Sequence, residues 1–143
     1  MADKLRSAWW RLAKPPLEGV AIVATDLNEN LLLIRLSYGS GGWSLPTGGV
    51  NGEESAADAD RRELLEETGC TAHSLKPLGI QEDQLCGTAN KVSVFSAKVS
   101  EQPTADMREV VEARFFPMHS LSEPLTKATP RRLELYRESL KQG

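Results

Sequence analysis

The chain has 143 residues, which is enough for one domain that buries its own hydrophobic core. Hydrophobic residues make up 40% and charged residues 26%, a balance that indicates a globular protein and excludes a disordered one. The net charge of −3 gives no general attraction to nucleic acid or to an anionic membrane, so we expect neither as a partner. A phosphorylated ligand would need a metal ion or a few arginines at its binding site to balance its negative charge.

The cysteines and the apolar runs bear on the cellular location of the protein. Cys70 and Cys86 match neither a disulfide framework nor a zinc pattern, so a reducing, cytoplasmic location is the plain interpretation. The longest apolar runs, VAIVA and LLLI, are too short to cross a membrane.

The chain is expected to divide into two parts. Residues 1–16 form a basic lead-in that contains Trp9–Trp10 and ends in two prolines, and residues 17–143 form a single domain. We expect the tryptophan pair to pack either on that domain or on a second copy of the chain. In the second case the protein would be a homodimer.

In chain order, the hydrophobic pattern predicts strands, a helix, further strands and a final helix. β-Branched residues predict a first hairpin over 19–38, and alternation predicts a buried strand later in the chain. The expected strands span 19–25, 31–38, 72–81, 90–99 and 109–118, and the final helix spans 129–142, with Leu133, Tyr136 and Leu140 on one apolar stripe. This order fits a sheet with helices on its faces.

The first helix has clear ends and an unusual charge pattern. Ser55 is a typical N-cap and Gly69 a typical C′ residue. Between them Glu63, Glu66 and Glu67 meet on one side of the helix, where like charges cost roughly 0.2–0.5 kcal/mol per pair. A cluster of hard carboxylate oxygens without His or Cys selects Mg²⁺ or Mn²⁺, so a bound divalent cation explains why the repulsion is tolerated.

The spacing across residues 48–70, G-x5-E-x7-R-E-L-x-E-E-x-G-C, resembles the signature of the Nudix hydrolases, the Nudix box. The resemblance implies an α/β (α+β) fold, an α/β/α sandwich in which a mixed β-sheet is flanked by helices. It also implies magnesium-dependent hydrolysis of a diphosphate linkage in a nucleoside diphosphate derivative, by water attack at phosphorus. The expected partner is therefore a small nucleotide.

The resemblance also implies roles for individual residues. Glu63, Glu66 and Glu67 would ligate the metal together with the backbone carbonyl of Thr47, and one glutamate would act as general base. Arg62 is four residues from Glu66 and could orient it. One further acidic residue is expected from the late strand or from the loop before it, and the candidates there are Glu109 and, as the alternative, Glu112.

Three points stay open. Glu54 could support a ligand or act only as a favourable charge at the helix N-terminus. Thr47 stands where the family commonly has Gly, and a β-branched residue would be strained there if φ were positive. Arg35 and Tyr38 are candidates for substrate contact. As for the function, the alternative is a Nudix-fold domain that senses a nucleotide without hydrolysing it.

Overall fold

The computed structural model describes residues 18–85 and 88–142, so Trp9–Trp10 and Cys86 lie outside the described residues. The strands are β1 (Glu18–Thr25), β2 (Asn30–Leu36), β3 (Trp43–Ser44), β4 (Thr47–Gly49), β5 (His73–Leu85), β6 (Thr88–Lys98) and β7 (Val110–Pro117). The helices are α2 (Ala56–Thr68) and α3 (Thr129–Gln142).

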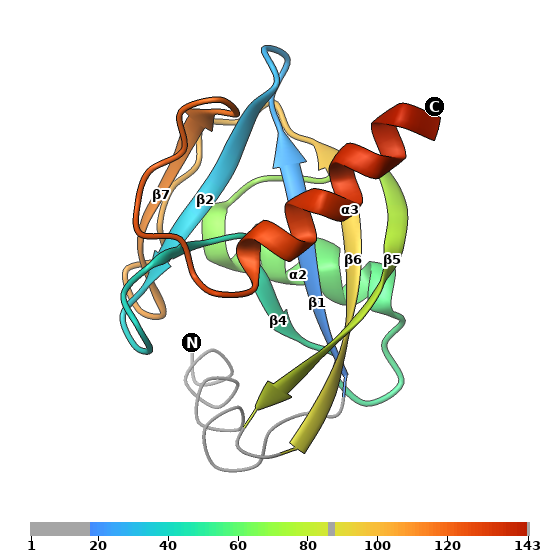
Figure 1. Ribbon diagram of the computed structural model, residues 1–143. Helices are drawn as coiled ribbons and strands as arrows, with labels where there is room; N and C mark the ends of the chain where they lie inside the picture. Colours follow the sequence, from blue (N-terminus) through green and yellow to red (C-terminus); the bar gives the residue numbers. More distant parts are fainter. Residues whose placement is uncertain (1–17, 86–87, 143) are drawn as a thin grey trace.

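The strands form one mixed sheet around β1. Its main order is β3-β2-β1-β6-β5, with β4 paired to β1 and β7 paired to β2. β1 and β6 run parallel over eight registered pairs, and the other pairings are antiparallel. Helix α3 lies in front of the sheet and α2 behind it (Figure 1), which confirms the predicted sandwich.

Strand β1 is buried on both faces because each face is covered by a helix. Val20, Ile22 and Ala24 pack in one core cluster, which also contains residues of α2. Ala21 and Val23 pack in the other cluster, together with residues of α3. The near-continuous apolar run of this strand is typical of a central strand covered on both sides.

Helix α2 begins and ends where the sequence predicts. The Ser55 hydroxyl accepts a hydrogen bond of 3.1 Å from the backbone N–H of Asp58. Gly69 adopts φ 74°, and its N–H donates to the carbonyl of Leu65 at 2.9 Å. Both ends are therefore satisfied locally, by residues that are visible in the sequence.

The structure corrects several boundaries. The short strands β3 and β4 lie in the glycine-rich segment 39–54, where the sequence analysis expects no strand, and β5 extends to Leu85. Strand β2 ends at Leu36, because its pairing with β7 becomes irregular between Arg35 and Leu36. The predicted stripe on α3 is shorter than expected, since Leu140 is 61% exposed while Leu133 and Tyr136 are buried. None of the helices in the described ranges is long and apolar enough to span a membrane.

Candidate active site

Arg62 of α2 is the centre of a polar cluster in which all five of its guanidinium N–H groups are used. Nε and Nη2 bind the two carboxylate oxygens of Glu54 at 2.8 and 3.0 Å. Nη2 also donates to the carbonyl of Gly49 at 2.9 Å. Nη1 donates to Glu63 Oε1 and to Glu66 Oε1, both at 3.1 Å. The guanidinium therefore holds the glycine-rich loop and two carboxylates of the helix in one fixed arrangement.

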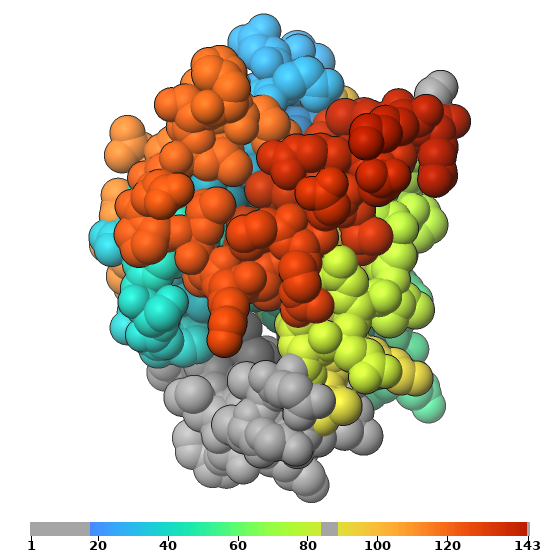
Figure 2. Space-filling view, in the orientation of Figure 1, coloured from blue at the N-terminus to red at the C-terminus, as the bar shows by residue number. Residues whose placement is uncertain are grey.

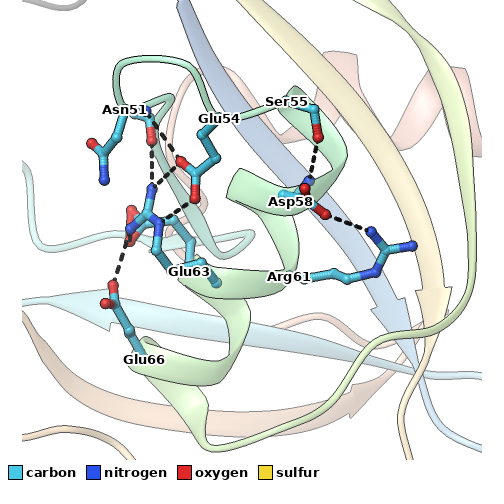
Figure 3. Close-up of polar contacts among 9 residues, drawn as sticks. Asn51, Glu54, Ser55, Asp58, Arg61, Glu63 and Glu66 are labelled. Atoms are coloured by element: carbon cyan, nitrogen blue, oxygen red, sulfur yellow. Dashed lines mark hydrogen bonds and ion pairs between the residues drawn. The ribbon is translucent and has the colours of Figure 1, made fainter.

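Glu54 accepts two of the hydrogen bonds of Arg62, and its contacts show whether it supports the site or only adds charge at the helix N-terminus. It also accepts from the backbone N–H of Asn51 at 3.1 Å, so it closes the loop back onto the helix (Figure 3). The hydrogen bond from Arg62 lowers the pKa of Glu54, and the same bond raises the pKa of Arg62. Glu54 thus supports the loop and orients Arg62, and both groups stay charged.

Gly48 forms a cradle for the carboxylate of Glu63. A Cβ atom at position 48 would lie 1.4 Å from Glu63 Oε2, far inside any allowed contact. Only glycine lets the strand approach the helix this closely. The first glycine of the 48–70 spacing is therefore required by packing, because it makes room for a carboxylate that is only 2% exposed.

The inner face of α2 carries three buried carboxyl groups. Glu63 is 2% exposed, and Glu67 and Asp60 are 0% exposed. Neither carboxyl oxygen of Asp60 has a hydrogen-bond partner within 18–85 and 88–142. Burial, with a smaller contribution from the charge of Glu63, raises the pKa of Asp60 to about 8.

Asp60 is a residue that the sequence analysis missed. It precedes Glu63 by three residues and Glu67 by seven, which is the spacing of one helical face, so the signal was present. Glu66 lies differently from the other two box glutamates, because it is exposed and turned toward Arg62.

The predicted site residues outside α2 fall into two groups. Glu109, just before β7, is only 2% exposed, and its backbone carbonyl accepts a 2.7 Å hydrogen bond from the N–H of Ser37. Glu112 instead faces Arg35 across the β2–β7 pair, and the two form an ion pair near the surface. The guanidinium of Arg35 also lies over the ring of Trp43, 5.6 Å from its centroid. Of the two acidic candidates, Glu109 is therefore the buried one.

Tyr38 precedes the glycine-rich segment 39–54, and Thr47 lies within it. Thr47 pairs with Ala21 in the β1–β4 ladder, and it is not among the described residues with positive φ. The strain considered for a β-branched residue at this position does not arise. Tyr38 lies just beyond the end of β2 and is partly buried.

A cavity of about 240 Å³ opens beside β4. Thr47 and Gly48 form part of its lining, and strand residues Gly19, Asn90 and Val92 form another part. Gly48 therefore borders Glu63 and also lines the cavity.

The far wall of this cavity comes from the start of α3 and from β5. Arg132 is 5% exposed, and its guanidinium pairs with the carboxylate of Asp83 and donates to Gln81 Oε1 at 2.7 Å. Arg131 pairs with the same carboxylate at 2.5 Å. Burial alone would raise the pKa of Asp83, but the hydrogen bonds from Arg132 and Arg131 outweigh it and lower that pKa. The sequence analysis named none of these four residues.

The donor chemistry beside Gly48 fits a hard divalent cation. Buried carboxylates are the groups that Mg²⁺ and Mn²⁺ select, and the oxygens of Asp60, which have no hydrogen-bond partner among the described residues, add acceptors to this face. As the side chains lie, no three His, Cys, Asp or Glu residues of the described part are grouped so as to hold a metal ion. Ligation by Glu63 and Glu66 together would require their oxygens to turn from Arg62 Nη1.

Comparison with known proteins identifies relatives along most of the chain. The RNA pyrophosphohydrolase of Pasteurella multocida is 44% identical over 66 residues, which cover 46% of this chain and 33% of the relative. The NAD-capped RNA hydrolase ndx-9 of Caenorhabditis elegans is 26% identical over 126 residues, which cover 80% of this chain and 34% of the relative. The chain thus spans about a third of the length of these curated relatives.

Solved structures show the same fold. A MutT NUDIX hydrolase from Burkholderia pseudomallei superposes with a TM-score of 0.75 at 27% identity, covering 84% of this chain and 97% of that one. The NUDIX domain of Shewanella oneidensis NrtR, solved in complex with ADP ribose, gives 0.77 at 22% identity, covering 89% and 90%. The family model of the NUDIX domain matches residues 15–138, and the chain therefore belongs to the NUDIX family.

Proposed function

We propose that the protein is a pyrophosphohydrolase that depends on Mg²⁺ or Mn²⁺ and cleaves the diphosphate linkage of a nucleoside diphosphate derivative. The observation that carries this proposal is the arrangement around Gly48. Buried carboxylates and a fully engaged Arg62 lie on one side of that glycine, and a cavity large enough for part of a ligand lies on the other.

The contacts of the carboxylates and of Arg62 support a role for each of them. Glu63 and Glu67 would hold the cation, and Glu66 would join them on leaving Arg62. When bound, the metal neutralises charge on the phosphates and lowers the pKa of a bound water. A carboxylate of α2, or Glu109, takes the proton of the attacking water. Glu54 and Gly49 fix the guanidinium independently, so Arg62 keeps its position when the oxygens of Glu63 and Glu66 turn toward the cation.

The cavity supports a nucleotide as the ligand. A substrate whose diphosphate lies against β4 at Thr47 and Gly48 has its remaining part beside Gly19, Asn90 and Val92. Strand β4 thus lies between the bond to be cleaved and the group to be recognised.

The competing substrate is the 5′ end of an RNA, because two relatives are named for RNA. A 5′ triphosphate or a dinucleotide cap contains the same kind of anhydride bond. We favour the small nucleotide, because a net charge of −3 provides no general attraction for the many phosphates of an RNA chain. Hydrolysis of free nucleotides, compared with hydrolysis of a short 5′-triphosphorylated RNA at equal concentration, decides between the two.

The second candidate function is a domain that binds a nucleotide without cleaving it. The structural similarity to a NUDIX domain complexed with ADP ribose favours considering it. The chain retains Glu63, Glu66 and Glu67 with the full box spacing, and this favours the enzyme.

The test is release of nucleotide or phosphate from a panel of nucleoside diphosphate derivatives with Mg²⁺. Wild type is compared with Glu67→Gln and with Glu134→Gln, a matched change at an exposed position of α3. We expect Glu67→Gln to lose at least about 10²-fold in kcat and Glu134→Gln to lose nothing. Equal activity of wild type and Glu67→Gln would refute the role of that residue, and binding without turnover across the panel would favour the sensor.

A further inference from the structure

Asn90 on β6 is a buried amide that lines the cavity. The residue is only 8% exposed, and its Oδ1 atom is buried without a hydrogen-bond partner among the described residues. A buried polar group left in this state destabilises the fold. An asparagine kept for the fold would use its Oδ1 atom to accept from the backbone or from a neighbouring side chain, and among the described residues the Oδ1 atom of Asn90 does not.

The backbone around Asn90 is shaped to leave room beside the amide. A Cβ atom at position 19 would lie 3.1 Å from the carbonyl oxygen of Gly48 and 3.4 Å from Asn90 Nδ2. Because Gly19 has no side chain, no atom from that position crowds the amide or the carbonyl, and Gly19, Gly48 and Asn90 all line the cavity. Gly19 pairs with Gly49 of β4, the strand that we assign to the diphosphate.

The other walls of the cavity determine which chemistry fits. Asp83 is paired with Asn90 across the β5–β6 ladder, but its carboxylate is already neutralised by Arg131 and Arg132. Val92 adds an apolar surface on the β6 side. The Arg132 guanidinium in the wall is held by Asp83 and Gln81, so the neutral amide beside an apolar surface suits a flat, uncharged heterocycle better than a second phosphate.

The size of the cavity agrees with this. Its volume of about 240 Å³ lies just below the roughly 300–1,000 Å³ of pockets that hold a whole drug-sized ligand. One ring system fits, and the sugar and phosphates would extend past β4.

We propose that Asn90 is a specificity-determining residue that hydrogen-bonds the edge of the substrate's nucleobase. A side-chain amide offers an acceptor and donors side by side, so it pairs with a base edge that has a donor next to an acceptor. The inference deepens the proposed function and rests on it for the position of the diphosphate, but it is tested by binding, without turnover.

The test measures binding of the four nucleoside monophosphates and of ribose 5-phosphate by calorimetry. The proteins are wild type, Asn90→Leu, and Asn28→Leu as a matched change at an exposed turn position. We expect Asn90→Leu to weaken the tightest-binding monophosphate by about tenfold and to leave ribose 5-phosphate unchanged, because only the base contact is lost. Its melting temperature should not fall, since the substitution removes a buried oxygen that has no hydrogen-bond partner among the described residues.

A second variant, Asn90→Asp, keeps the shape and the acceptor but removes the donors. It should change the order in which the four monophosphates bind. Unchanged affinities in both variants would overturn the proposal, and so would equal losses for monophosphates and ribose 5-phosphate, which would mean a purely structural role. These results are distinguishable from failure of the proposed function, which would appear as absent hydrolysis whatever the binding at Asn90.

Discussion

The burial of Asp60 predicts a measurable pH dependence of stability in the absence of divalent cations. Its pKa is about 8 in the folded protein, against an ordinary value of 3.8 in the unfolded chain. Below the lower value the group is protonated in both states. Between the two values the unfolded chain releases this proton and the folded protein keeps it, so the free energy of unfolding falls as pH rises.

The magnitude follows from the width of this window. Each pH unit inside it costs about 1.4 kcal/mol, so this one group removes about 3 kcal/mol between pH 5 and pH 7. That is a large fraction of the stability of an ordinary domain. Asp60→Asn has a similar shape and no titration, so its stability should lack this fall.

The assay is urea denaturation at pH 5, 6 and 7 with EDTA present throughout. The quantity of interest is the difference in free energy of unfolding between wild type and Asp60→Asn, which should grow by about 3 kcal/mol over the range, while other titrating groups cancel. Asp58→Asn, at an exposed position of the same helix, is the control and should follow wild type. Parallel curves for wild type and Asp60→Asn would show that Asp60 is not held protonated in the fold.

Two further substitutions test the geometry around Arg62 and Gly48. Gly48→Ala places a Cβ where Glu63 Oε2 now lies, so we expect a loss of at least about 10²-fold in kcat in the hydrolysis assay, and retained activity would contradict the cradle. Arg62→Lys replaces a five-donor fork by a point charge that cannot hold Glu54 bidentately, so chemical denaturation should show a loss of about 1–3 kcal/mol, and a loss below about 0.5 kcal/mol would mean that the clamp is unimportant for stability.

The parts of the molecule that could be predicted are those fixed by nearby residues. The bounds of α2 follow from Ser55 and Gly69, because caps act within one helical turn. The alternation along β6 predicts its two buried faces, with Val92 and Val94 in one cluster and Phe95 in the other.

The rest depends on contacts that spacing alone does not reveal. The predicted pairing of Arg62 with Glu66 is present, but Arg62 also binds Glu54, eight residues earlier and just before the N-cap of α2, through two hydrogen bonds. The position of Glu54 depends on the path of the preceding glycine-rich segment, which the sequence left undetermined. β3 and β4 are too short to show a period, and each exists because a neighbouring strand supplies its partner. Likewise, whether the Oδ1 atom of Asn90 finds a hydrogen-bond partner among the described residues depends on strands that are distant in the sequence.

The segments that form the two sides of Gly48 come from different parts of the chain. The carboxylates belong to α2, whereas the far wall of the cavity is built from β5, β6 and the start of α3, which covers the front of the molecule (Figure 2). Substitutions at Asn90 would therefore leave in place the carboxylates to which we assign the proposed cleavage. Such a layout gives directed evolution a way to retarget the protein to new ligands while its chemistry stays constant.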